Sequence, residues 1–157
     1  MGKELAKRKK WQFLDLDEFI ELKEKRAIAD IFAQSGEPYF RRLEKNTLKE
    51  VSGQKNFVVA CGGGIVTDPI NIKAMKETGL MVCLNAKPEV ILKRTSGYLH
   101  RPLLNVKDPK KQIDLLLKLR AHYYAQAHFC VDTSKLSVKE VVGKILKKIP
   151  KSKKAKK

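Results

Sequence analysis

The sequence predicts a three-layer α/β protein, in which a parallel β-sheet carries α-helices on both faces. Helical and strand-like segments alternate along the chain, which is typical of parallel sheets. The run Phe57–Ala60 is continuously apolar, as expected for a strand buried on both faces. A length of 157 residues fits one domain with a single core.

The elements follow from local signals in chain order. Gly36, Gly53 and Gly79 are helix stop signals, and Asp68-Pro69 combines a helix cap with a first-turn proline. In the first half, the predicted segments are a helix over 2–9, a strand at Trp11–Leu14, and helices over about 17–24, 27–34 and 37–51. In the second half, they are strand 57–60, helix 68–79, strand 80–84, helix 88–95, loop 96–109, helix 110–126, strand 129–131 and a last helix that opens with the capping box Ser137–Glu140.

Composition limits the class of protein. The net charge is +17, and seven lysines lie within 147–157, so we expect residues 148–157 to form a disordered tail after a domain over 1–147. The basic body predicts affinity for anions, which fits nucleotides, carboxylates and nucleic acids alike. No apolar run is long enough to span a bilayer and no signal-like stretch opens the chain, so a cytoplasmic protein without membrane contacts is predicted.

The three cysteines, Cys61, Cys83 and Cys130, show no CxxC spacing. Each lies at or beside a short apolar run, which favours buried free thiols over metal ligands or disulfides.

Two carboxylates, Asp15 and Asp17, directly follow the first predicted strand, where ligands of parallel sheets bind. Their spacing places them on one side of an extended segment. Such a pair suits coordination of metal-bound water and acceptance of a proton from a substrate hydroxyl. The alternative is that Asp17 caps the following helix through Glu21.

Gly62, Gly63 and Gly64 follow the second predicted strand. Three glycines let a backbone turn tightly and approach a ligand closely, and their amides can bind anionic or hydroxyl groups. A structural turn rarely needs three in a row, so a ligand contact is predicted.

Single arginines are less informative. Arg41 and Arg42 point about 100° apart on a helix, so at most one faces a site. Arg120 could bind a carboxylate through its planar fork or form a surface salt bridge. Arg101, in the loop 96–109, could close over phosphates as a lid residue or belong to an ordinary surface loop.

Six blocks taken together resemble the shikimate kinase family over about residues 2–147. They are FLDLDEFIE, IADIFAQSGEPYFRRLE, ACGGGIV, the RT…RPLL segment, LRAHYYAQA and VDT. The resemblance implies a P-loop-kinase-like fold in a monomer that phosphorylates the 3-hydroxyl of shikimate with ATP and Mg²⁺, in the route to aromatic amino acids.

The resemblance also assigns roles on the substrate side. It implies that Asp17 binds and polarises the shikimate hydroxyl, and that Arg41 and Arg120 grip the shikimate carboxylate. It implies a backbone contact to shikimate from Gly63, within Gly62–Gly64. On the nucleotide side, the resemblance implies that Arg101 is the lid arginine that reaches the phosphates and that Arg94 packs near the adenine. It places Asp15 near the water ligands of the metal.

The sequence departs from the family at one point. A kinase of this type needs a strand followed by GxxxxGK[ST], and no such motif occurs in the 157 residues. The opening MGKELAKR resembles the helix that directly follows this loop. We therefore expect the first central strand and the phosphate loop to be missing, through a misplaced start or a real truncation, and we expect the chain as given to be inactive without them.

Three alternative functions remain open at this stage. A related kinase could act on another small acid or a sugar acid such as gluconate. A catalytically dead remnant could retain the shikimate pocket without turnover. A nucleic-acid-binding protein would need a recognition motif, and none occurs in the sequence, so only weak binding through the lysine tail is expected.

Overall fold

The computed structural model describes residues 1–96 and 102–149. Four short strands alternate with the helices, as predicted. The strands are β1 (Gln12–Asp15), β2 (Phe57–Ala60), β3 (Val82–Asn85) and β4 (Phe129–Asp132). The helices are α1 (Gly2–Lys9), α2 (Leu16–Glu24), α3 (Ile28–Val51), α4 (Pro69–Thr78), α5 (Pro88–Thr95), α6 (Pro109–Tyr124) and α7 (Val138–Lys148), with single 3₁₀ turns η1 (Ile65–Thr67) and η2 (Pro102–Leu104).

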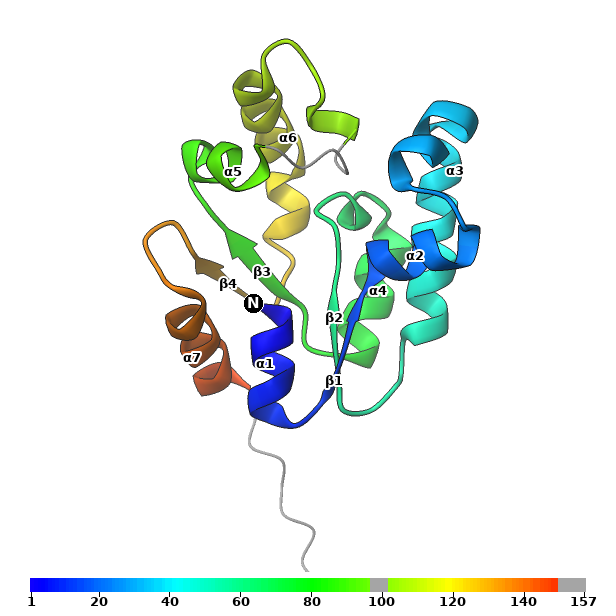
Figure 1. Cartoon of the computed structure of the whole chain (residues 1–157). Coiled ribbons are helices and arrows are strands. Elements are labelled where there is room, and N and C mark those ends of the chain that lie inside the picture. The colour runs from blue at the N-terminus through cyan, green and yellow to red at the C-terminus, as the bar shows by residue number, and fades with distance from the viewer. Residues whose placement is uncertain (97–101, 150–157) are drawn as a thin grey trace, which may run out of the picture.

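The strands form two parallel pairs, β1–β2 and β3–β4. Phe13 lies opposite Val58 in the first pair, and Cys83 lies opposite Cys130 in the second. Figure 1 shows the two pairs within one molecule, with β2 and β3 as their inner strands. Among the described residues, no strand pairs with the second edge of β2 or of β3.

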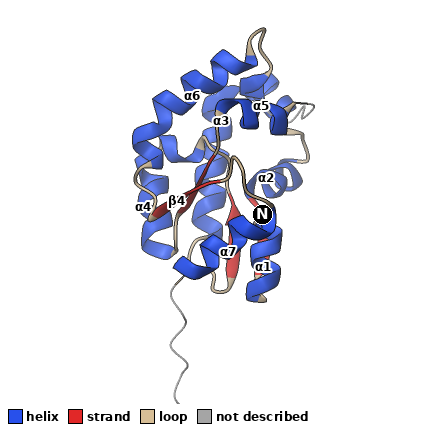
Figure 2. Cartoon of the chain, turned by 90° about the vertical axis from the view of Figure 1, so that its left-hand side faces the viewer, coloured by secondary structure: helices blue, strands red, loops and turns tan. Residues whose placement is uncertain are grey.

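Helices lie on both sides of the strands, with α4 and α6 to the left and α1 and α7 to the lower right in Figure 2. The larger apolar core surrounds β1 and β2, where Leu16, Ile20 and Ile31 are almost fully buried. A smaller core joins Val131 to α7. Leu5 of α1 packs against this second core, while α1 also contacts β1 and β2. The first helix therefore connects the two parallel pairs.

Local sequence signals explain several helix ends. The Asp68 carboxylate accepts a hydrogen bond from the Ile70 amide at 2.8 Å, so it caps α4 as predicted. Ser137 and Glu140 form the predicted capping box at α7.

Helix α3 runs through both helices predicted over 27–51, but Gly36 interrupts it with φ 77° and ψ 168°. This positive φ is accessible to glycine at little cost, and Pro38 follows within the second segment. The predicted stop at Gly36 is therefore a break between two helical segments.

Some predictions of burial are wrong. β2 is half-buried along its length rather than buried on both faces, because only one of its edges is paired within the described chain. The cysteines are free, as predicted, but Cys61 and Cys130 are exposed and Cys83 is half-buried. Two of them, Cys83 and Cys130, lie on the β3–β4 pair.

The chain ends differ slightly from expectation. Lys148 is the last residue of α7, so the helix includes the first residue of the predicted tail. Residues 150–157 of that tail lie outside the described residues. In the part of the chain that the structure describes, no helix is both long and apolar enough to cross a membrane.

Candidate active site

Side chains from three helices meet at the glycine run that follows β2. A Cβ atom at Gly62 would lie 3.6 Å from both carboxylate oxygens of Asp17 and 3.7 Å from Oε1 of Glu44. Asp17 lies in the first turn of α2, and Glu44 lies on α3. The glycines therefore allow acidic side chains from two elements to approach the backbone closely.

The next glycine contacts α6. The Tyr124 hydroxyl donates a hydrogen bond to the Gly63 carbonyl oxygen at 2.9 Å. A Cβ atom at Gly63 would lie 2.9 Å from this hydroxyl and 3.8 Å from Nη1 of Arg120. Arg120 and Tyr124 are one helical turn apart, so both face the glycine run from one side of α6.

The third glycine contacts Arg41. A Cβ atom at Gly64 would overlap the Arg41 guanidinium, so only glycine leaves room for this arginine. The guanidinium donates from Nη1 to Oε2 of Glu44 at 2.5 Å. It also donates from Nη2 and Nε to Oε1 of Glu37, at 2.7 and 3.1 Å. Two carboxylates therefore fix the orientation of Arg41 against the backbone.

Glu44 is the most deeply buried charged residue of this cluster, with 1% of its side chain exposed. Burial raises the pKa of the Glu44 carboxyl and the nearby Asp17 carboxylate adds to this, while Arg41 and Arg120 lower it. Burial opposes the charge of Arg41 as well, yet Glu44 and Glu37 outweigh it and raise the pKa of Arg41. The ion pair thus keeps a fixed positive group beside the glycine run.

The two aspartates after β1 have different roles. Asp15 is the N-cap of α2, because its Oδ1 accepts hydrogen bonds from the amides of Asp17 and Glu18, at 3.0 and 3.4 Å. The alternative in which Asp17 caps α2 through Glu21 is wrong, since Glu21 instead accepts from the Ile28 amide at 2.8 Å. Asp17 therefore faces the glycine run and not the helix end.

Two other arginines were predicted to belong to the site. Arg94 contacts a different part of the molecule, and Arg101 lies outside the described residues. Arg94 donates to the hydroxyl and the carbonyl oxygen of Thr133, both at 2.8 Å. It therefore joins α5 to the segment after β4.

Cys61 directly precedes the glycine run but is poorly suited to act as a nucleophile. The residue as a whole is exposed, while its thiol lies against the protein beside Glu44, Asp17 and Asp15. Burial and these carboxylates raise the pKa of the Cys61 thiol to about 12. The thiolate, which is the reactive form, is therefore scarce at neutral pH.

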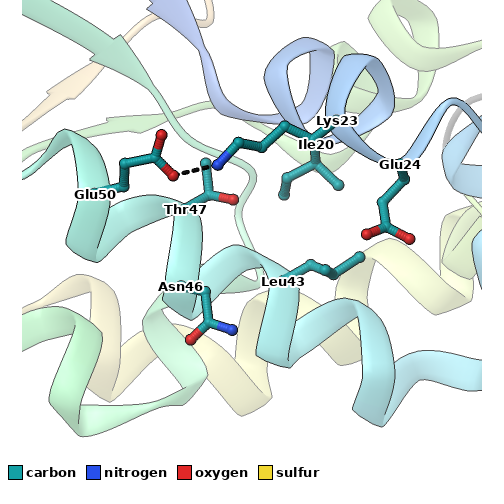
Figure 3. A pocket seen from close by; sticks show the side chains of 7 residues that line it. All are labelled: Ile20, Lys23, Glu24, Leu43, Asn46, Thr47 and Glu50. Carbon is teal, nitrogen blue, oxygen red and sulfur yellow. Dashed lines mark hydrogen bonds and ion pairs between the residues drawn. The ribbon is translucent and has the colours of Figure 1, made fainter.

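Two cavities of the described chain lie beside this cluster. A cavity of about 190 Å³ opens between α2 and α3. Figure 3 shows the Lys23–Glu50 ion pair along it, with Leu43 and Ile20 on its walls. A second cavity, of about 350 Å³, lies between the end of β3 and α6 and includes Tyr124 in its lining. At the glycine run itself, the Arg41 guanidinium and the Tyr124 hydroxyl lie directly against the backbone.

Glu44 is the member of the site that sequence reasoning missed. It lies three residues after Arg41 on α3, a spacing that places two side chains on one helix face. That spacing was the available signal, but the burial of Glu44 depends on packing that the sequence does not show.

The comparisons with known proteins identify the family. The family model for shikimate kinase matches residues 1–150. The chain belongs to the shikimate kinase family. The shikimate kinase of Thermoanaerobacter pseudethanolicus is 39% identical over 147 residues, covering 94% of this chain and 86% of the relative. The shikimate kinase of Thermus thermophilus is 41% identical over 150 residues, covering 95% and 82%.

Solved shikimate kinases share the fold. The structure of shikimate kinase from Acinetobacter baumannii in complex with shikimate superposes with a TM-score of 0.90 at 36% identity, covering 93% of this chain and 82% of that one. The enzyme from Aquifex aeolicus gives a TM-score of 0.78 at 34% identity, covering 92% and 84%. The predicted family and its α/β fold with parallel strands are therefore confirmed.

Proposed function

We propose that this chain binds shikimate at the glycine run and takes part in transfer of a phosphoryl group from MgATP to the shikimate 3-hydroxyl. The observation that supports this best is the meeting of Asp17, Arg41 and Arg120 at Gly62–Gly64. A carboxylate beside two guanidinium groups suits a substrate that carries both a hydroxyl and an acid. Solved shikimate kinase with shikimate bound has the same fold.

The arginines would bind the acid. Arg41 is already held by two carboxylates, so little side-chain entropy is lost when its free edge meets a substrate. Arg120 approaches Gly63 from the opposite helix. Two guanidinium groups on different elements can fix a carboxylate in one orientation, which positions the rest of the molecule over the glycines.

Asp17 would accept the proton of the reacting hydroxyl. Its carboxylate lies beside Gly62, whereas Arg120 and Tyr124 lie beside Gly63. A hydroxyl that points toward Asp17 becomes a better nucleophile as its proton moves to the carboxylate. ATP supplies the phosphoryl group when it is bound, and the family uses ATP with Mg²⁺.

Fewer residues support the nucleotide side of the proposed site. We propose that Arg94 lies near the adenine and that Arg101 closes over the phosphates. Arg94 is anchored on the buried Thr133, which would fix this wall of the site. Asp15 is proposed to contact the water ligands of Mg²⁺ through Oδ2, since its Oδ1 caps α2.

The described residues do not by themselves form a phosphate site. No GxxxxGK[ST] motif occurs in the 157 residues, and no strand in the described chain pairs with the inner edges of β2 and β3. Unpaired backbone groups at two inner edges are costly when they are buried. We propose that a further parallel strand, carrying the phosphate loop, fits between β2 and β3.

A protein that binds shikimate without turnover is the second candidate, because the 157 residues contain no GxxxxGK[ST] motif. In that case shikimate would bind and no phosphate would be transferred. A cytoplasmic, monomeric protein is proposed in either case.

Calorimetric titration with shikimate tests the acceptor site. We expect saturable binding that is much weaker for the methyl ester of shikimate and for gluconate. Arg41→Met should abolish most of this affinity. The matched control is Arg42→Met, because Arg42 is exposed and lies over the Tyr39 ring at 5.4 Å. Equal affinity in both variants would contradict the proposed site.

An ADP-release assay separates the two functions. It compares the chain as given with one in which a strand and a GxxxxGK[ST] loop from a shikimate kinase are fused before Met1. Turnover only in the fused chain would support the strand proposal. Shikimate binding without turnover in both chains would favour a binding protein.

A further inference from the structure

Cys83 and Cys130 lie opposite each other in the β3–β4 pair. Neighbouring strands are about 4.8 Å apart, and side chains in register point to the same face of a sheet. The Cys130 thiol is close enough to Cys83 to help raise the pKa of the Cys83 thiol. The two thiols therefore lie side by side.

The contacts of the two thiols show which part of the molecule they face. The Cys83 thiol donates to Oδ1 of Asn85 at 2.9 Å, and the Cys130 thiol contacts the Tyr124 carbonyl oxygen at 3.8 Å. Asn85, Tyr124 and Cys130 all line the cavity of about 350 Å³. Cys130 therefore lines the cavity directly, and the Cys83 thiol contacts Asn85 on its wall.

Ordinary cysteine chemistry does not suit the pair well. Burial and the neighbouring Cys130 raise the pKa of the Cys83 thiol to about 12, so Cys83 is slow to attack oxidants or alkylating agents at neutral pH. A disulfide would also require the sulfurs at about 2.05 Å. A bridging atom that accepts two sulfurs at a wider separation avoids the distance requirement of a disulfide.

We propose that Cys83 and Cys130 form a bidentate binding site for trivalent organic arsenicals, with the organic group in the adjoining cavity. An aryl arsenoxide forms two As–S bonds as its As–O bonds break. The oxide leaves as water with the two thiol protons, and no oxidation state changes. The cavity is lined by Leu117, Ala121 and Ala125, and a benzene ring fits an apolar cavity of about 150 Å³.

The third cysteine provides a control within the chain. Cys61 follows β2 in the other strand pair, and the groups that act on its thiol are carboxylates, not a second thiol. It can offer arsenic one sulfur at most. A single As–S bond lacks the chelate advantage, which is worth about 10²–10⁴ in affinity.

The test uses the full chain with phenylarsine oxide and intact-mass spectrometry. We expect one phenylarsenic group per chain in the unmodified protein and in Cys61→Ser, displaced by 1,2-ethanedithiol but not by glutathione. Cys83→Ser and Cys130→Ser should each bind at least about 100-fold more weakly. Unchanged affinity in either variant, or loss of the adduct in Cys61→Ser, would overturn the proposal.

Two further measurements guard against misfolded variants. In the unmodified chain, phenylarsine oxide should protect both Cys83 and Cys130, but not Cys61, from slow alkylation by N-ethylmaleimide. Ala121→Leu should fill the cavity and weaken the binding of phenylarsine oxide, while the binding of the smaller methylarsine oxide should not change. Protection of one thiol alone would refute the bidentate site, and equal weakening of both arsenicals would refute the role of the cavity.

Discussion

Replacing Arg41 with methionine removes one partner of a buried ion pair and leaves the other in place. Nη1 of Arg41 lies 2.5 Å from Oε2 of Glu44, whose side chain is 1% exposed. Breaking a buried pair from one side costs about 3–5 kcal/mol, because an uncompensated charge remains. This is a large share of a native stability of about 5–15 kcal/mol, so we expect Arg41→Met to be strongly destabilised at neutral pH.

The cost should depend on pH in a defined direction. The folded-state pKa of Glu44 is raised above its ordinary value of 4.5 by burial, and Arg41 lowers it. In Arg41→Met the folded pKa therefore rises further. A group with a raised folded pKa contributes stability that is present below its unfolded pKa and is lost as the pH rises through its folded pKa. The variant and the unmodified chain should thus differ little near pH 4.5 and increasingly above it.

The double variant Arg41→Met/Glu44→Gln separates stability from binding. Glutamine keeps the shape of Glu44 without its charge, so most of the lost stability should return. Shikimate affinity should stay about 10–100-fold below that of the unmodified chain, because hydrogen bonds to a charged group are worth about 1.5–3 kcal/mol. Urea unfolding between pH 4.5 and 8, with calorimetry for shikimate, measures both. A loss of stability in Arg41→Met that is the same at every pH would refute this reasoning, as would a double variant no more stable than the single one.

Three further predictions follow from single contacts. Tyr124→Phe loses the hydrogen bond to the Gly63 carbonyl, so shikimate affinity by calorimetry should fall about 3–10-fold, corresponding to about 1 kcal/mol; unchanged affinity would remove Tyr124 from the site. Gly64→Ala places a methyl group on the Arg41 guanidinium and should weaken shikimate binding at least tenfold. Unchanged affinity in this variant would contradict the prediction, because it would mean that a displaced Arg41 still binds the substrate. Ser137→Ala breaks the capping box of α7 and should cost about 1 kcal/mol in urea unfolding with no change in shikimate binding.

The sequence was most informative where local backbone chemistry decides the structure. Close approach to the glycine run after β2 was predicted because only glycine permits it, and Asp17, Arg41 and Arg120 do approach it, while the ligand contact there stays a prediction. Capping signals at Asp68 and Ser137 also predicted the starts of two helices. Such features depend on neighbours in the chain, so a single sequence contains them.

Features set by long-range packing were not predictable in this way. Glu44 reads as a surface residue of a charged helix, yet the approach of Gly62 and Asp17 buries it. That Asp15 and not Asp17 caps α2 depends on where α2 begins, and helix boundaries are uncertain by one or two residues. The half-burial of β2 reflects an edge without a paired strand in the described chain, which the apolar pattern of Phe57–Ala60 cannot reveal.

The arrangement of charge at the glycine run explains why a carboxylate substrate suits this site better than a phosphate would. Glu37 and Glu44 already balance much of the charge of Arg41, and Glu44 also interacts with the charge of Arg120. The cluster therefore offers directed N–H donors with little excess positive charge. A singly charged acid can use such donors through geometry, whereas a phosphate would also need net positive charge. We therefore expect specificity for an acid alcohol to depend on the acidic partners of the arginines as much as on the arginines themselves.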